Sequence, residues 1–239
     1  MITLAIDTSE TRGSVAILKE GRRAAVRRHE SHEDYSSWLL PAVGACLKEA
    51  GVGMEEVELL AACTGPGSFT GLRVGLTTIK AWAEVYGKKV VGVSRLETLA
   101  RSSEAGAPFV AASYDAQRGQ MFAAIYRRTE SGLEQLGEEM VVEAACLVKI
   151  AAEIAGQERI AWVSLEEAKI TETEGWRARE RAGDSMVRAD GELASKVGEI
   201  AEECARKQLF SDPVALDANY VRRSDAEIFW KGPAADHVR

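Results

Sequence analysis

Residues 63–87 read CTGPGSFTGLRVGLTTIKAWAEVYG and join a short apolar strand to a long helix through a loop rich in glycine. Glycine-rich loops that open helices often bind phosphate, because backbone N–H groups and the helix dipole point at the anion. The known phosphate loops do not fit here. A P-loop needs a lysine after its last glycine, where this chain has Leu72-Arg73. The dinucleotide motif G-x-G-x-x-G needs a glycine at position 70, where this chain has threonine.

We therefore expect this loop to act as a structural elbow. Its two glycines allow backbone angles that other residues avoid, and the proline between them stiffens the turn. Ser68 or Thr70 can cap the helix that follows by accepting a backbone hydrogen bond. The competing interpretation is that the helix N-terminus binds a nucleotide phosphate. The loop residues concerned are Gly65, Pro66, Gly67 and Ser68.

The expected strands and helices around this loop occur twice along the chain. In the first half the strands are 1–7, 14–19, 22–29, 57–63 and 89–93, and the helices are 31–50, 70–86 and 94–103. In the second half the strands are 107–114, 120–128, 133–142 and 159–164, and the helices are 143–155 and 191–208. Residues 169–184, KITETEGWRARERAGD, are expected to be a loop.

This order of elements predicts two similar lobes of the α/β class. Hairpins that precede crossover helices are typical of mixed sheets. We place the first lobe at residues 1–103 and the second at 104–239, and leave open which lobe the C-terminal segment joins.

Composition and charge restrict the function classes. The chain has 239 residues, of which 46% are hydrophobic and 28% charged, as in ordinary folded domains. Its formal net charge of −7 disfavours a protein that binds nucleic acid on its own, because phosphate binding depends on Lys and Arg. The four cysteines are scattered, and we recognise neither an export signal nor a membrane span. We therefore expect a cytoplasmic protein.

Two of the expected helices, 31–50 and 70–86, are apolar around most of their circumference. A surface helix normally has one apolar stripe, which packs on its own sheet. A second stripe indicates a partner, because large exposed apolar patches usually mark interaction sites. We expect an outer seam made of Tyr35, Leu39, Val43, Leu72, Arg73, Leu76, Ile79, Lys80 and Ala83.

An aspartate ends the first strand of each half, at Asp7 and Asp115. In a kinase, such carboxylates orient Mg²⁺ or water near the phosphates, whereas at a strand end they equally accept turn hydrogen bonds. Both roles fit Asp7-Thr8-Ser9. The bulky Arg118 favours the turn role for Asp115, because a phosphate loop needs small residues there. The sequence has no H-E-x-x-H motif, and we expect neither a metal site nor catalytic residues.

Three segments resemble the TsaB family, also called YeaZ. They are LAIDTSETRGSVAI at 4–17, GPGSFTGLRVGLTTIKAWA at 65–83 and SYDAQRGQMFAAIY at 113–126. The similarity extends from residue 1 to about residue 128. It implies two ribonuclease H-like lobes of the actin/sugar-kinase/Hsp70 ATPase superfamily.

The resemblance also implies a function. Members of the family are non-catalytic scaffold subunits in the synthesis of threonylcarbamoyladenosine at N6 of adenosine 37 in tRNA. They bind the catalytic subunit TsaD, or a second copy of themselves, through the two apolar helices, and they help to recruit the ATPase TsaE. The resemblance implies contact with tRNA only through the complex. It implies no tightly bound cofactor, with ATP or ADP a candidate in the assembled complex.

A small-molecule kinase of the sugar-kinase class is the alternative function. Such a kinase should have a second phosphate loop and an adenosine pocket in its second lobe. The second half of this chain is short and highly charged, which disfavours the kinase. A metallopeptidase would need metal ligands for which the sequence offers no pattern.

Overall fold

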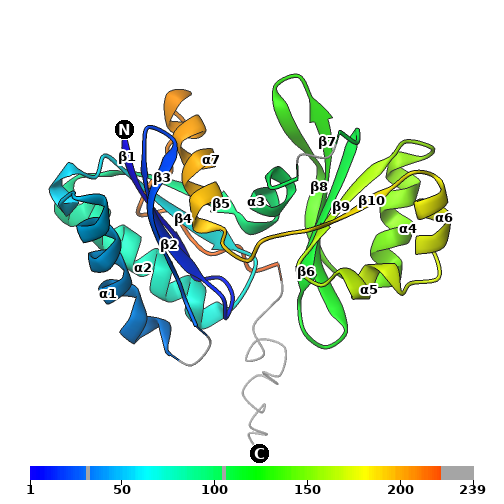
Figure 1. The fold of residues 1–239 in the computed structure, drawn as a ribbon, viewed down its shortest axis with the longest axis horizontal. Coiled ribbons are helices and arrows are strands. Elements are labelled where there is room, and N and C mark those ends of the chain that lie inside the picture. Colours follow the sequence, from blue (N-terminus) through cyan, green and yellow to red (C-terminus); the bar gives the residue numbers. More distant parts are fainter. Residues whose placement is uncertain (31–32, 104–105, 222–239) are drawn as a thin grey trace, which may run out of the picture.

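The structure is a computed structural model that describes residues 1–30, 33–103 and 106–221, and it has two lobes (Figure 1). The first lobe contains the strands β1 (Ile2–Asp7), β2 (Ser14–Lys19), β3 (Arg22–Arg28), β4 (Leu59–Gly65) and β5 (Lys89–Ser94). The second lobe contains β6 (Phe109–Asp115), β7 (Gln120–Thr129), β8 (Gly132–Glu143), β9 (Ile160–Ser164) and β10 (Ser185–Arg188). Within the described ranges, no helix is both long and apolar enough to cross a lipid bilayer.

The two sheets have the same strand order. The first runs β3-β2-β1-β4-β5 and the second runs β8-β7-β6-β9-β10. In each sheet the first three strands of the chain pair antiparallel and the last two add in parallel. The predicted duplication is therefore confirmed, with β10 as a strand that the sequence did not reveal.

The first sheet is covered on both faces because its strands alternate two sets of apolar side chains. Leu4, Ile6 and their neighbours pack against α1 (Tyr35–Ala50) and α2 (Phe69–Tyr86). Ala5, Leu18 and their neighbours pack against α7 (Ala194–Arg206), which lies between the two sheets in Figure 1. A short 3₁₀ helix, η1 (Met54–Glu56), precedes β4.

The second sheet is also covered on both faces. Its outer face packs against α4 (Ala144–Ala155), α5 (Glu167–Thr171) and α6 (Trp176–Arg181). Its inner face packs against α3 (Arg95–Arg101), a helix that we expected within the first lobe. The loop predicted for residues 169–184 is wrong. Ile170 and Trp176, at most 5% exposed, anchor α5 and α6 in the core of this lobe.

The end of the described chain returns to the first lobe, and we call residues 211–221 the C-terminal strap. Ser211 N donates to the carbonyl of Val90 at 2.8 Å, so the strap begins along the edge strand β5. Leu216 is 9% exposed and joins the core beneath α2. Asn219 N donates to the carbonyl of Thr64 at 2.8 Å, and its Nδ2 donates to Glu139 of the second lobe at 2.6 Å. The strap thus joins both lobes; residues 222–239 lie outside the described residues.

Candidate functional site

The glycines of the 65–83 motif allow α2 to lie directly on the loop that follows β1. A Cβ atom on Gly67 would lie 2.1 Å from the carbonyl oxygen of Ser9, and one on Gly71 would lie 2.1 Å from that of Thr8. A Cβ on Gly75 would lie 2.3 Å from Thr8 Oγ1. These three glycines, spaced four residues apart, are therefore needed for close contact between two protein segments.

Hydrogen bonds also join the start of α2 to the loop that follows β1. Thr8 Oγ1 donates to the carbonyl of Gly71 at 2.7 Å, and Ser68 N donates to the carbonyl of Ser9 at 2.7 Å. Ser68 caps α2, since its Oγ accepts from Gly71 N at 3.3 Å. The peptide bond between Gly65 and Pro66 is cis, and Gly65 has φ of 100°. The contacts of Gly67, Ser68 and Gly71 with the loop after β1 support the structural elbow.

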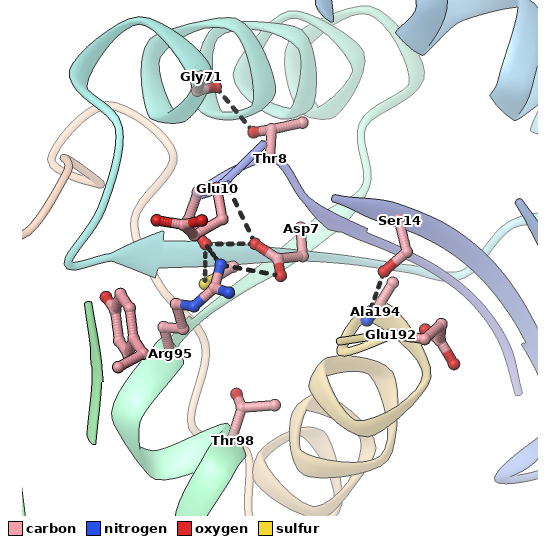
Figure 2. A network of polar contacts seen from close by, with 12 residues as sticks. Asp7, Thr8, Glu10, Ser14, Gly71, Arg95, Thr98, Glu192 and Ala194 are labelled. Atoms are coloured by element: carbon pink, nitrogen blue, oxygen red, sulfur yellow. Dashed lines mark hydrogen bonds and ion pairs between the residues drawn. The ribbon is translucent and has the colours of Figure 1, made fainter. Parts of the chain in front are cut away.

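Asp7 lies at the centre of a buried polar network (Figure 2). Its Oδ1 accepts hydrogen bonds from Ser9 N, at 3.0 Å, and from Ser9 Oγ. Its Oδ2 lies 3.4 Å from Nη1 of Arg95, the first residue of α3. The side chains of this ion pair are 0% and 1% exposed, so water does not screen the pair.

Arg95 is held on several sides. Its Nη1 also donates to Ser9 Oγ, and its guanidinium lies 4.6 Å from the ring centroid of Tyr114. Tyr114 in turn donates its hydroxyl hydrogen bond to the carbonyl of Pro66, which ties the second lobe to the elbow. Burial opposes the charge of Arg95, but Asp7 together with Tyr114, Cys63 and Glu10 outweighs this effect, and the pKa of Arg95 is raised above its ordinary value. Arg95 therefore stays protonated.

This arrangement decides what Asp7 can do in the isolated chain. Both carboxylate oxygens are occupied, and the charge is balanced by a guanidinium of the same chain. A divalent cation at this carboxylate would have to displace Arg95. The geometry therefore favours a turn and ion-pair role for Asp7 over orientation of Mg²⁺.

The loop after β6 is also arranged as a turn. Asp115 Oδ1 accepts from Gln117 N at 2.9 Å and from Lys169 Nζ at 2.6 Å. Asp115 N donates to Glu166 at 2.9 Å. Gln117 and Arg118 both have positive φ, 64° and 56°, as in a tight turn. Asp115 thus has the turn role that the sequence favoured.

A cleft of about 1000 Å³ separates the two strand-end loops. Its lining carries acidic and basic side chains. Glu10 and Glu166 face the cleft from opposite lobes, and burial raises the pKa of both carboxyl groups. Arg12, Arg28 and Arg188 line the cleft as well. Arg28 is already paired with Asp190 at 2.9 Å. The cleft therefore lacks the excess of free positive charge that a polyphosphate prefers.

The structure corrects the expected composition of the outer seam. Six of its apolar members are at most 5% exposed and belong to the protein's own core: Leu39, Val43, Leu72, Leu76, Ile79 and Ala83. The second stripe of α2 is more exposed: Val85 is 74% exposed, whereas Val74 is half-buried and also packs against the core. On α1 the exposed apolar side chain is Leu40, at 57%. A shallow groove between the two helices is lined by Tyr35, Ser36, Leu39, Leu40, Arg73, Val74, Thr77 and Thr78.

The polar members of the expected seam have contacts within the chain. Tyr35 donates its hydroxyl hydrogen bond to the carbonyl of Glu10, and its ring stacks on His29 with 4.2 Å between centroids. The Arg73 guanidinium lies 3.8 Å from the ring centroid of Phe69. Lys80 Nζ donates to the carbonyl of Leu216, at 2.9 Å, and so holds the C-terminal strap.

Sequence reasoning missed the roles of Arg95, which neutralises Asp7, and of Tyr114, whose ring lies against Arg95. Arg95 belongs to none of the quoted segments and pairs with a residue 88 positions away, and the segment at 113–126 does not reveal what Tyr114 contacts. The only available signal for Arg95 was a cation at the start of an apolar helix, next to the apolar strand KVVGVS. The glycine spacing could have identified the inward face of α2, since Gly71 and Gly75 mark the side that touches another segment.

Comparison with known proteins gives consistent relatives. Residues 26–209 match the family model described as "TsaD: tRNA N6-adenosine threonylcarbamoyltransferase". The chain is 33% identical over 199 residues to the tRNA threonylcarbamoyladenosine biosynthesis protein TsaB of Escherichia coli (strain K12), which covers 81% of this chain and 80% of that protein. A match to TsaB of Bacillus subtilis (strain 168), 32% identical, covers 57% of this chain and 59% of that protein.

Solved structures agree with these relatives. YeaZ from Pseudomonas aeruginosa superposes with a TM-score of 0.72 at 27% identity, over 92% of this chain and 99% of that chain. Component A of (R)-2-hydroxyglutaryl-CoA dehydratase from Acidaminococcus fermentans shares the fold, with a TM-score of 0.52 at 10% identity over 86% and 99% of the two chains. The predicted α/β class with two lobes of the actin/sugar-kinase/Hsp70 type is confirmed. By its sequence relatives and its fold, the chain belongs to the TsaB (YeaZ) family, related to the TsaD family whose model it matches.

Proposed function

We propose that this chain is a non-catalytic, cytoplasmic subunit of the machinery that makes threonylcarbamoyladenosine on tRNA. The names of the Escherichia coli and Bacillus subtilis relatives support the pathway, and the matching family model describes the transferase itself. The single observation that carries the non-catalytic role is the buried Asp7–Arg95 ion pair.

The ion pair argues against catalysis for a physical reason. Phosphoryl transfer depends on cations held where negative charge develops, and a strand-end carboxylate commonly holds such a cation. In this chain the carboxylate instead holds a guanidinium that is 1% exposed and pinned by Ser9 and Tyr114. Displacing Arg95 would leave a buried charge unpaired, which costs several kcal/mol.

The proposed partner is a TsaD-like catalytic subunit, which docks on the outward stripe of α1 and α2. We define this outer strip by Leu40, Val74, Thr78, Ala81 and Val85. Leu40, Ala81 and Val85 are exposed, whereas Val74 and Thr78 are half-buried and Val74 also packs against the core. Helix-on-helix docking suits this geometry, because its α2 members are three or four residues apart. A second copy of the chain can use the same strip when the partner is missing. The assembled pair would then help to recruit a TsaE-like ATPase, with ATP or ADP entering only at that stage and tRNA bound through the complex.

The interface is tested by Leu40→Glu in co-purification with the TsaD-like subunit of the same organism. A carboxylate placed in an apolar contact costs on the order of several kcal/mol, so the complex should be lost at micromolar concentration. Leu209→Glu is the matched control, because Leu209 is 61% exposed and lies outside both helices. If the Leu40→Glu protein is as stable as wild type and still co-purifies with the partner at the wild-type level, the outer strip is not the interface.

The non-catalytic role is tested separately with the purified chain. We expect no steady ATP hydrolysis by the chain alone, measured by phosphate release after two orthogonal purification steps. A rate that survives purification and disappears in Asp7→Ala would assign catalysis to this carboxylate and favour the kinase class instead.

A further inference from the structure

An aromatic recess at the mouth of the interlobe space has no role in the function proposed above. Phe69, the first residue of α2, and Tyr220 of the C-terminal strap are 39% and 37% exposed. Their rings contact each other, with 5.1 Å between centroids and 35° between planes. They line a recess of about 440 Å³ together with Glu10, Phe122 and Asn219.

A cation holds the two rings in place. The Arg73 guanidinium lies 3.8 Å from the Phe69 ring centroid, and Arg73 Nε donates to the Tyr220 hydroxyl at 3.3 Å. Arg73 itself remains exposed. The rings are therefore positioned before any ligand arrives, which lowers the entropy cost of stacking a planar group on them.

The rest of the recess suits the edge of a planar polar group. Glu10 presents a half-buried carboxylate, and Asn219 keeps its amide oxygen as an acceptor while its Nδ2 donates to Glu139. Phe122 adds an apolar wall, and its ring centroid lies 5.3 Å from that of Tyr114. Exposed aromatic faces beside arginine and hydrogen-bond acceptors are the features with which proteins hold unpaired bases.

We propose that this recess stacks an unpaired base of an RNA strand, so that this chain supplies part of the contact between the complex and its RNA. The proposal rests on the proposed function, because the matching family model is named for an enzyme that modifies adenosine in tRNA. A base suits the recess, since two aromatic rings and the acceptor atoms of Glu10 and Asn219 line it.

The charge of the chain determines how this contact behaves. With a net charge of −7, the protein cannot neutralise many phosphates. Base stacking, and not counterion release, must therefore supply most of the binding free energy. One or two phosphate contacts, beginning with Arg73, give a slope of about −0.7 to −1.4 for log affinity against log salt on a single strand.

The experiment uses the full-length chain and an anticodon stem-loop RNA with 2-aminopurine in its loop. Stacking quenches 2-aminopurine fluorescence, so titration gives both affinity and base environment. We expect saturable quenching, weakened at least about 5-fold by Phe69→Ala and by Tyr220→Ala. The ring-preserving variants Phe69→Tyr and Tyr220→Phe should retain most of the affinity, and Leu209→Ala, which removes an exposed apolar side chain elsewhere, should change nothing.

Four results would overturn the proposal. The first is absence of quenching by the wild-type chain, and the second is equal affinity of wild type and Phe69→Ala. The third is displacement of the RNA by equimolar AMP, which would make the recess a mononucleotide site. The fourth is loss of co-purification with the TsaD-like subunit in Phe69→Ala without loss of RNA quenching, which would make the rings a protein contact. Co-purification of the Leu40→Glu protein with the TsaD-like subunit is measured in parallel. A result that refutes the outer strip as the partner interface is thereby distinguished from a result that refutes the recess as a base-binding site.

Discussion

Replacing Arg95 by methionine should destabilise the protein by about 3–5 kcal/mol, because it leaves Asp7 buried without its counter-charge. The estimate follows from burial: the two side chains are 1% and 0% exposed and 3.4 Å apart. The substitution also removes the hydrogen bond to Ser9 and the contact with the Tyr114 ring. Since folded domains are typically stable by about 5–15 kcal/mol, the loss would be a large fraction of the total.

Urea unfolding followed by circular dichroism measures this effect. Arg101→Met is the control on the same helix, because Arg101 is 25% exposed and its pairs with Glu97 and Glu203 should each contribute about 1 kcal/mol or less. Combining Arg95→Met with Asp7→Asn should cost at least about 1 kcal/mol less than the sum of the single changes, since neutralising Asp7 removes the unpaired charge. A loss below 1 kcal/mol for Arg95→Met, or strictly additive single and double variants, would refute the argument.

Three further expectations concern stability. Gly71→Ala should destabilise the chain by about 1–3 kcal/mol in urea unfolding, because its Cβ meets a backbone carbonyl at 2.1 Å, whereas Gly44→Ala, in open space on α1, should stabilise it by up to about 1 kcal/mol. Glu10→Gln should raise Tm at pH 7 but not at pH 4. Burial raises the folded-state pKa of Glu10, so the protein is more stable when this carboxyl group is protonated. That stability is present at low pH and is lost as the pH rises through the folded-state pKa. Leu216→Ala should cost about 2 kcal/mol by removing the strap's apolar anchor, against no more than about 0.5 kcal/mol for Val214→Ala, which is 83% exposed.

Much of the fold could be predicted from the sequence because its signals are local. Short apolar runs between turn residues placed nine of the ten strands, and the capping residue Ser68 with its neighbouring glycines placed the start of α2. The strand that was missed, β10, has four residues, two exposed and two half-buried, so it carries little pattern. The helices α5 and α6 have five and six residues, which is too short for a helical period to emerge.

The site was predictable only in part, because its residues are selected by tertiary contacts. Leu76 and Val74 belong to two apolar stripes of α2 that look equally suited to a sheet, and only the contact of Gly71 with Thr8 determines which stripe turns inward. Arg95 carries no sequence signal that links it to Asp7, since the two are joined only when α3 leaves β5.

The return of the chain to its first lobe has a consequence for synthesis on the ribosome. Strands β6–β10 are contiguous in the sequence, so the second lobe can fold as soon as they emerge. The first lobe begins earlier but cannot be completed until α7 and the C-terminal strap are translated, because α7 covers Ala5, Leu18 and Val91. At about 5–20 residues per second, α7 follows α3 by roughly 5–20 s. During that interval the nascent chain presents an open apolar sheet face, the kind of surface that chaperones bind, so the lobe that starts first is the last to be finished.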